Sequence, residues 1–342
     1  MELKFKSAFL VVTGLALTLM SAHADEPKID HTHSASLVLL GTAGGPVLRT
    51  TRSQPASMLV VNGDVYLIDA GDGASAQITK SGHSLPSVRA VFLTHHHMDH
   101  TAGLAGVLAF NWSVVRQTPL FIYGPPGTEA LVQRGLSYFS ISEDIFKRES
   151  PAVPGMADNP RPADIHGGGD VYEDENIRVI AAENSHFHNV CHDEACPELK
   201  SFSYRFEIKG GNKPTSVVFT GDTGPSKSVV ELAKDTDVLV SEIIDLPSTV
   251  IFLRDYIRLP EASLTPMVAH METEHLTPEE VGKLARDSGA KTVVLNHFVW
   301  GNQDKEPDVE KLTNVVSKVY GGNIIPGYDL QVIDLQRSNK VE

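Results

Sequence analysis

One motif constrains this chain more than any other feature: residues 95–100 read HHHMDH. It places four imidazoles and a carboxylate within six residues, directly after an apolar run that predicts a strand. Imidazole nitrogen and carboxylate oxygen are the usual ligands of zinc and of similar divalent metals. In an extended segment, side chains two residues apart point the same way, so His95 and His97 can bind one ion. Where the chain then turns toward a helix, Asp99 and His100 can reach a second ion.

Three further candidate ligands follow predicted strands later in the chain. They are His186, Asp222 and His297. Loops at strand ends are where α/β folds gather functional groups. An isolated His or Asp at such a place is more often a cap or a solvated side chain, but with the motif these residues make seven candidate ligands. His188 competes with His186, which we prefer because it comes first after its strand.

Strand and helix signals alternate along the chain and favour a single layered α/β domain. The apolar segment 58–67 predicts two strands joined by a hairpin turn at Asn62-Gly63-Asp64. The segment 277–288 predicts a helix, because Thr, Pro and two Glu at its start give a cap, a first-turn proline and early acids. Residues 149–170 are rich in Pro, Gly and Asp and predict a long loop, either an active-site flap or disordered surface.

The first 24 residues predict a signal peptide. Lys4 and Lys6 precede the apolar run 8–20, and Ala22-His23-Ala24 forms a small-residue cleavage site. The run is short for a membrane span, which needs roughly 20 apolar residues; an uncleaved anchor is the alternative. We therefore expect a mature hydrolase domain at 25–342 that works outside the cytoplasm, in the periplasm if the host is a Gram-negative bacterium, with no membrane partner.

The net charge and the two cysteines suggest which partners and which covalent links to expect. The formal net charge is −14 and no cluster of Lys and Arg stands out, so we expect no nucleic acid partner. The only cysteines, Cys191 and Cys196, predict a disulfide across a tight loop of an exported protein. A zinc-binding pair completed by His188 and His192 is the alternative.

The pattern His-x-His-x-Asp-His, with the three downstream ligands, resembles the metallo-β-lactamase superfamily. The resemblance runs from about Leu39 to Leu335, nearly the whole predicted mature chain. It implies an α/β fold, the αββα sandwich, with two zinc ions at one edge. It also implies how the ligands divide: His95, His97 and His186 for one zinc, Asp99, His100 and His297 for the other, and Asp222 as the bridge.

Within the superfamily, the ribonuclease Z branch is most similar. The resemblance lies in LGTAGGP at 40–46, LIDAGDG at 67–73 and NHF at 296–298. The branch also implies a histidine before a helix, here His275, which would contact the substrate and protonate the leaving oxygen. Glu242 would orient the ring of His275. These two residues and Asp99 are the expected catalytic residues.

Three assignments in this region have alternatives. His270 lies close enough in sequence to replace His275, and a helix start without chemistry is the alternative for His275 itself. For Glu242, the alternative is a buried acid with a structural role only. Asp69 either supports a zinc ligand from behind or only caps a turn.

The resemblance implies hydrolysis of a small anionic ester by water activated on the metal pair. Because the branch includes secreted arylsulfatases, we expect an arylsulfatase. A class II cyclic-nucleotide phosphodiesterase is the first alternative, and a non-catalytic periplasmic zinc-binding protein is the second. Lactonase and β-lactamase activities fit the His275 region less well. A transfer-RNA 3′ endonuclease is set aside because of predicted export and negative charge. Relatives in the branch also imply a homodimer.

Overall fold

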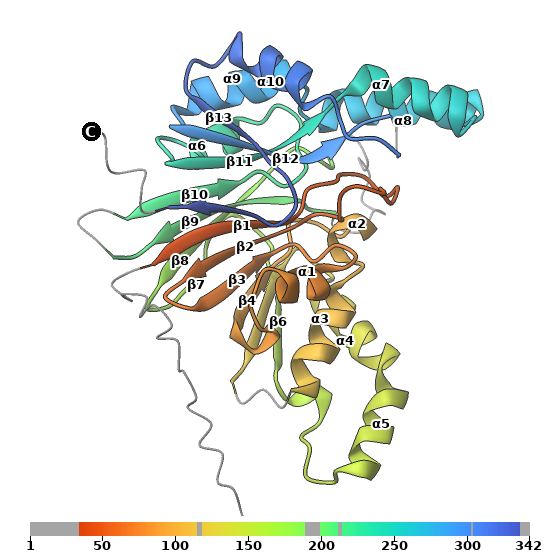
Figure 1. Ribbon diagram of the computed structural model, residues 1–342, viewed down its shortest axis with the longest axis vertical. Helices are drawn as coiled ribbons and strands as arrows, with labels where there is room; N and C mark the ends of the chain where they lie inside the picture. The colour runs from red at the N-terminus through yellow and green to blue at the C-terminus, as the bar shows by residue number, and fades with distance from the viewer. Residues whose placement is uncertain (1–33, 115–117, 189–198, 211–213, 302–303, 336–342) are drawn as a thin grey trace, which may run out of the picture. The chain divides into compact units, whose positions relative to one another are not determined.

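The computed structural model describes residues 34–114, 118–188, 199–210, 214–301 and 304–335. Contacts place these residues in one compact unit, His33–Glu342. The predicted signal peptide at 1–24 and the predicted disulfide between Cys191 and Cys196 lie outside the described residues. Two seven-stranded sheets form the centre of the described part of the chain (Figure 1).

The first sheet is mixed. Its strand order is β14-β1-β2-β3-β4-β5-β6. The strands are β1 (Ala35–Gly41), β2 (Ala56–Val61), β3 (Asp64–Ile68), β4 (Val88–Phe92), β5 (Leu120–Gly124), β6 (Pro160–Asp164) and β14 (Gln331–Asp334). β14, β1, β2 and β3 pair antiparallel, and β3 to β6 pair parallel. The hairpin expected within 58–67 is confirmed as β2 and β3.

The second sheet repeats this plan. Its order is β13-β12-β11-β10-β9-β8-β7. The strands are β7 (Gly169–Glu173), β8 (Ile177–Glu183), β9 (Phe202–Ile208), β10 (Thr215–Phe219), β11 (Val238–Ile244), β12 (Thr292–Val299) and β13 (Asn323–Pro326). The strands from β7 to β10 pair antiparallel, and those from β10 to β13 pair parallel. Parallel strands carry their C-terminal ends to one edge, where functional groups gather.

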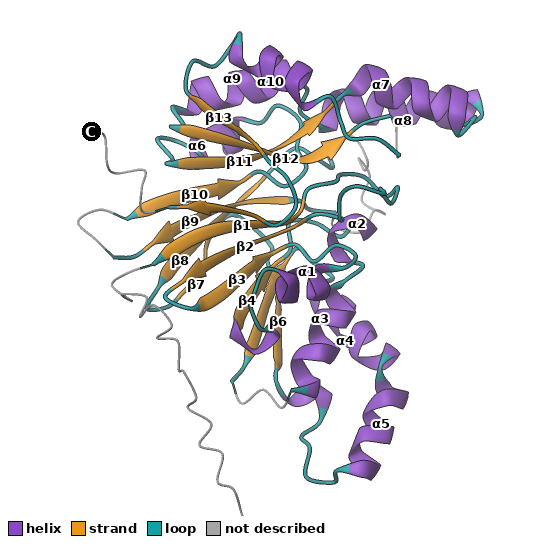
Figure 2. Cartoon of the chain, viewed as in Figure 1, coloured by secondary structure: helices purple, strands orange, loops and turns teal. Residues whose placement is uncertain are grey.

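Helices cover the outer faces of the two sheets, and some of them extend beyond the sheets (Figure 2). The first group is α1 (Ala74–Lys80), α2 (Met98–Thr101), α3 (Leu104–Ser113), α4 (Thr128–Tyr138) and α5 (Ser140–Glu149). The second group is α6 (Lys227–Leu232), α7 (Leu246–Ile251), α8 (Glu261–Glu274), α9 (Pro278–Ser288) and α10 (Val309–Ser317). Apolar side chains of α1, α3 and α4 pack on the first sheet, and those of α6, α9 and α10 pack on the second. The αββα sandwich is therefore confirmed.

The core between the sheets contains a group of packed aromatic rings. Phe92 of β4 lies edge-on to Phe206 of β9, with 5.2 Å between ring centroids, and 5.8 Å from Tyr204. All three rings are fully buried. Burial of such rings, which remove 150–250 Å² each from water, fixes the two sheets against each other. The edge from which the candidate ligands project is thereby held as one rigid frame.

Two segments differ from the sequence prediction. The long loop expected at 149–170 is wrong, because β6 and the start of β7 lie within it. Pro160 and Pro162 suit β6 because it is an edge strand. On the open side of an edge strand, a residue without an N–H loses no hydrogen bond to a neighbouring strand. The second difference is α7 and α8, which fill a stretch where the sequence analysis predicts no helix. The helix expected at 277–288 is confirmed as α9, with the capping box between Thr277 and Glu280. No helix in the described ranges is long and apolar enough to span a bilayer.

Candidate metal centre

The seven candidate ligands meet at one edge of the sandwich, in two clusters of donor atoms. The motif follows β4, His186 follows β8, and Asp222 follows β10. His297 differs from expectation because it lies within β12 rather than after it, at a shift in the pairing of β11 and β12. Its φ of 44° lies in the left-handed region, which is strained for a residue with a side chain. In this conformation, Nε2 of His297 lies 3.1 Å from Nε2 of His100.

The first cluster consists of three histidines. Nε2 of His95 lies 3.0 Å from Nδ1 of His97, and Nε2 of His186 lies 3.2 Å from the same atom. The outer nitrogens of two rings are also engaged: Nδ1 of His95 with the Thr94 hydroxyl, and Nδ1 of His186 with the Glu274 carbonyl, each at 3.0 Å. Burial lowers the pKa of His95 and of His186 well below the usual range. Neutral rings present lone pairs, which is the form that binds a metal.

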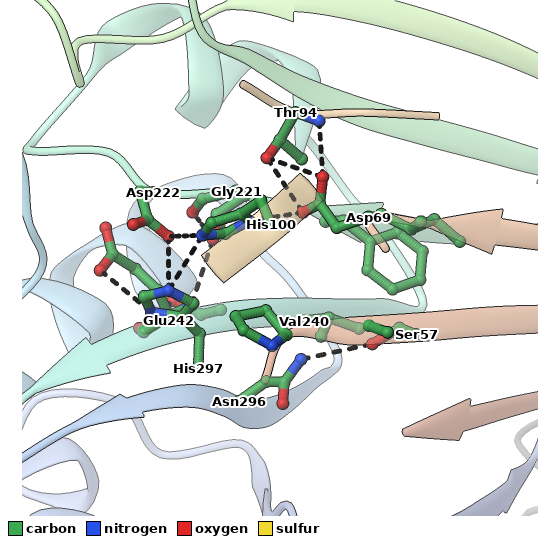
Figure 3. A pocket seen from close by; sticks show the side chains of 16 residues that line it. Ser57, Asp69, Thr94, His100, Gly221, Asp222, Val240, Glu242, Asn296 and His297 are labelled. Carbon is green, nitrogen blue, oxygen red and sulfur yellow. Dashed lines mark hydrogen bonds and ion pairs between the residues drawn. The ribbon is translucent and has the colours of Figure 1, made fainter. Parts of the chain in front are cut away.

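The second cluster combines two histidines, His100 and His297, with two carboxylates, Asp99 and Asp222. Figure 3 shows His100, His297 and Asp222. Nε2 of His100 and Nε2 of His297 lie 3.1 Å apart. Oδ1 of Asp222 lies 3.1 Å from Nε2 of His297, and Oδ2 of Asp99 lies 3.5 Å from it. All four residues are buried. A buried group of charged oxygens and ring nitrogens at such distances needs a cation or shared protons to balance it.

Asp222 faces both clusters. Its Oδ1 lies in the second cluster, whereas its Oδ2 lies 3.9 Å from Nε2 of His95 in the first. Burial opposes the charged form of Asp222, but the charges of His297 and His100 outweigh it and hold the pKa of this carboxyl well below its usual range. An ionised carboxylate with one oxygen toward each cluster has the shape of a bridging ligand.

The donor sets fit zinc. Four ligands at about 2.0–2.1 Å from a tetrahedral zinc lie about 3.3 Å from one another. The nitrogen pairs at 3.0–3.2 Å are close to that spacing. Two nitrogens that both carry lone pairs repel each other at such a distance unless a cation or a proton lies between them. The residues present therefore suit a metal ion in each cluster.

Asp69 holds a ligand of the second cluster in place, so it does more than cap a turn. Its Oδ2 accepts a hydrogen bond from Nδ1 of His100 at 2.8 Å, and its Oδ1 accepts one from the backbone N–H of Thr94 at 2.8 Å. A carboxylate on the outer nitrogen of a ligand fixes its tautomer and raises its basicity. The sequence motif alone did not point to Thr94, which contacts Asp69 and His95.

A histidine–carboxylate pair lies beside the clusters. Nδ1 of His275 donates to Oε2 of Glu242 at 2.6 Å, and the backbone N–H of Thr223 donates to Oε1 of Glu242. Burial disfavours the charged ring, but Glu242 and then Asp222 outweigh it and raise the pKa of His275 to about 9. The structure therefore joins the two residues that the sequence analysis paired.

Two alternatives are decided by position. His188 is exposed and belongs to neither ligand cluster, so His186 is the histidine that the fold places there. His270 pairs with Glu274, with 2.5 Å between Nδ1 and Oε2, so His275 is the histidine that the fold joins to Glu242. The sequence analysis missed Glu274. The only sequence signal for Glu274 is that it lies four residues after His270. This spacing brings two side chains together only if the segment is a helix.

Gly44 in the GGP segment also contacts the site. A Cβ added there would lie 2.4 Å from Nδ1 of His297 and 2.7 Å from a methyl of Val299. The N–H of Gly44 donates to the carbonyl of Phe298 at 2.7 Å. The absence of a side chain thus lets this loop lie directly against His297.

Comparison with curated proteins places the chain near ribonuclease Z. Ribonuclease Z of Mycolicibacterium paratuberculosis is 30% identical over 272 residues, covering 77% of this chain and 85% of the relative. Ribonuclease Z of Methanosarcina acetivorans is 25% identical over 327 residues, covering 87% and 97%. Among solved structures, human tRNase Z, short form, matches with a TM-score of 0.60 at 20% identity, covering 88% of this chain and 99% of that one, which supports the fold.

These relatives correct two expectations. The arylsulfatase prediction is wrong, because the relatives that match over most of the chain are ribonucleases. The exclusion of nucleic acid is wrong for the same reason. The physical cause of the first error is that oxygen and nitrogen donors around two metals serve sulfur and phosphorus esters alike. The cause of the second is that net charge averages over the whole surface and does not describe one site.

The family model described as Beta-lactamase superfamily domain matches residues 65–298, which contain all seven candidate ligands. The αββα sandwich, the two donor clusters and the relatives agree with that match. The chain therefore belongs to the metallo-β-lactamase superfamily and, within it, to the ribonuclease Z-like branch of zinc-dependent hydrolases.

Proposed function

We propose that this protein is a two-zinc phosphodiesterase that cleaves phosphodiester bonds of RNA. The observation that carries the proposal is the His275–Glu242 pair beside two donor clusters that share Asp222. A proton donor next to a metal pair suits an ester whose leaving oxygen is a poor leaving group, as the oxygen of a ribose is. The names of the relatives favour RNA among such esters.

In this proposal His95, His97 and His186 hold one ion, while Asp99, His100 and His297 hold the second, with Asp222 between them. The ions, when bound, would activate water and offset charge on the non-bridging oxygens. Asp69 keeps the Nδ1 proton of His100 on the outer side of the ring, so that Nε2 faces the cluster.

His275 supplies the proton. Its Nδ1–H donates to Glu242, which leaves Nε2 as the nitrogen that faces a leaving oxygen. Against the effect of burial, the charge of Glu242 raises the pKa of His275 and so favours a ring with a proton on both nitrogens. Transfer of the Nε2 proton to the leaving oxygen as the phosphorus–oxygen bond breaks would avoid an alkoxide product. Glu242 keeps its position because the N–H of Thr223 binds its other oxygen.

One observation favours a second candidate, the hydrolysis of a 3′,5′-cyclic nucleotide. The formal net charge of −14 weakens the attraction of a long polyanion, whereas a single phosphodiester carries one charge. Both candidates break the same kind of bond, so the residue roles above are common to them.

The test compares chelator-sensitive turnover of four substrates by the metal-loaded protein: bis(p-nitrophenyl) phosphate, a precursor transfer RNA with a 3′ trailer, cyclic AMP and p-nitrophenyl sulfate. We expect turnover of the aryl phosphodiester and of the RNA, both abolished by chelator. Preference for cyclic AMP over the RNA would select the second candidate. No chelator-sensitive turnover of any phosphodiester would overturn the proposal and favour a zinc-binding protein without catalysis. Metal analysis of the active protein is expected to give two zinc ions per chain.

We also propose export through the N-terminal segment and assembly as a homodimer, both of which rest on the sequence alone. Export predicts that the mature protein begins at Asp25 and is recovered outside the cytoplasm. Mass spectrometry of the N-terminal peptide tests this: a retained Met1 in the active protein would contradict it. Light scattering of the purified protein tests the dimer, and a monomer mass would contradict it.

A further inference from the structure

A second histidine–carboxylate pair lies on α8, beside the first cluster. Nδ1 of His270 lies 2.5 Å from Oε2 of Glu274, one helical turn away. The Glu274 side chain is 1% exposed, whereas that of His270 is 28% exposed. The pair therefore runs from a buried carboxylate to an imidazole that is open to solvent. A carboxylate so buried costs free energy unless it is paired, which makes the position of His270 a constrained one.

The helix brings His270 against the site. Its ring centroid lies 5.3 Å from that of His186 and 5.5 Å from that of His275. Ring nitrogens of these three residues lie within 4.8 Å of one another. α8 is fixed here, because the Glu274 carbonyl binds Nδ1 of His186, and a Cβ on Gly224 would lie 1.9 Å from the Thr273 carbonyl. His270 is thus held beside His186 and His275, partly exposed, and belongs to neither ligand cluster.

A third metal ion does not explain His270. Such an ion would need His186, whose Nδ1 is bound to the Glu274 carbonyl and whose Nε2 lies 3.2 Å from Nδ1 of His97. One nitrogen cannot serve two ions, so the first cluster already uses this ring. With Nδ1 of His270 on Glu274, its Nε2 is the nitrogen left to meet a substrate.

The chemistry of the neighbouring residue identifies the group that His270 would meet. When the leaving oxygen beside His275 is the 3′ oxygen of a ribose, the adjacent 2′-hydroxyl lies next to it. A hydroxyl both donates and accepts, so it can bond to an imidazole nitrogen in either protonation state, unlike an anionic oxygen. The two rings lie almost perpendicular, at 88°, and can therefore contact two neighbouring oxygens of one sugar.

We propose that His270 binds the ribose 2′-hydroxyl next to the scissile phosphodiester, with Glu274 as its positioning residue, so that the site distinguishes ribose from deoxyribose. The proposal rests on the proposed function, and it applies to RNA and to cyclic nucleotides alike. The 2′-hydroxyl is the group by which proteins distinguish RNA from DNA. His270 would then set specificity, whereas His275 serves the bond that breaks.

The experiment measures kcat/KM for two pairs of substrates. The first pair is cyclic AMP and 2′-deoxy cyclic AMP. The second pair is an RNA dinucleotide and the same dinucleotide with a 2′-deoxy sugar on the 5′ side of the phosphate. For the wild-type protein we expect kcat/KM to be about tenfold or more higher for the ribose form, as for the loss of one hydrogen bond. In His270→Ala the ratio should fall to about one, with zinc content unchanged. Glu274→Gln keeps the shape of the side chain and removes its charge. In this variant the ribose-to-deoxyribose ratio of kcat/KM should fall by a smaller amount, because KM for the ribose form rises.

His188→Ala is the matched control, because this exposed histidine lies outside both clusters, and it should keep the wild-type ratio. Calorimetric binding of AMP and 2′-deoxy AMP to the zinc-loaded protein gives a readout without turnover, with the same expected order. An undiminished preference for ribose in His270→Ala, no preference in the wild-type protein, or loss of one zinc from His270→Ala would overturn the proposal. Absence of turnover with a ribose preference in binding would overturn the proposed function but not the role of His270.

Discussion

Asp69 and His100 are 31 residues apart in sequence and joined by a 2.8 Å hydrogen bond, in which Nδ1 of His100 donates to Oδ2 of Asp69. Asp69 has a φ of 57°, and its other carboxylate oxygen binds the N–H of Thr94, the residue before the motif. One carboxylate therefore fixes both the start of the motif and its last ring. The orientation of His100 depends on a residue that binds no metal itself.

Replacing Asp69 by Asn should weaken metal binding without removing a ligand. The amide cannot accept the His100 proton as a carboxylate does, so the tautomer and angle of the ring are no longer fixed, and metal affinity should fall about 10–100-fold. Competition with a chelator of known affinity measures this. Asp72→Asn is the control, since Asp72 is exposed in the same turn. Equal metal retention by both variants would contradict the role of Asp69.

Asp222→Ala and His275→Ala should separate metal binding from proton transfer. Asp222 reaches both clusters, so its loss should remove zinc and activity together. His275 pairs with Glu242 outside the ligand sets, so its loss should keep zinc while kcat falls about 10²–10⁴-fold, the usual effect of a missing general acid. Elemental analysis beside steady-state kinetics distinguishes the two. Normal kcat in His275→Ala on a substrate with a poor leaving group would show that another residue protonates the leaving oxygen.

Gly44→Ala should displace His297, because the new methyl would lie 2.4 Å from its Nδ1 and 2.7 Å from Val299. We expect loss of about one zinc per chain and a lower melting temperature. Gly45→Ala is a matched control: its φ is 78°, but a Cβ there meets nothing within 4 Å. That variant should lose about 1 kcal/mol of stability from backbone strain and retain its zinc. Full zinc content in Gly44→Ala would show that the loop yields without moving His297.

Asp237 should make folding stability depend on pH, far from any metal ligand in sequence. Its carboxylate accepts the N–H of Ser216 at 2.8 Å and Nζ of Lys291 at 2.6 Å. Burial opposes ionisation, but these bonds outweigh it and lower the pKa of Asp237. A lowered pKa in the folded state means that the stabilisation is complete above the unfolded value, near 3.9, and is lost as pH falls through the folded value.

Asp237→Asn should therefore lower the free energy of unfolding by about 1–2 kcal/mol at pH 7, as for the loss of a hydrogen bond from a charged group. The difference from the wild-type protein should shrink below about pH 4. Urea unfolding at several pH values measures it. A difference that stays constant from pH 7 to pH 3 would show that packing, and not the charge of Asp237, is responsible.

The ligand motif could be predicted from sequence because its residues are contiguous and their spacing alone places them on one side of a strand end. His186 could be preferred to His188 by its distance from β8. The His270–Glu274 pair could not be predicted, because it depends on α8, which contains Pro266 in its interior. A proline there removes a helical hydrogen bond and argues against a helix, and only packing of α8 on the second sheet, through Met271, overrides it.

The substrate class could not be predicted for a different reason. The donors around the clusters define a site for an anionic ester, but they do not distinguish sulfur from phosphorus. Likewise β6 contains two prolines in five residues and resembles a loop, although an edge strand tolerates them. In both cases the information lies in neighbours that are distant in sequence.

The donors that face each other across this edge come from both halves of the fold. Two lie in the loop after β4, two lie in α2, and three lie in or just after strands of the second sheet. The last of them, His297, is made only when most of the 342 residues have been synthesised. A chain that ends before β12 lacks His297, although it contains all three histidines of the first cluster. The second cluster is therefore complete only when strands of both sheets are present.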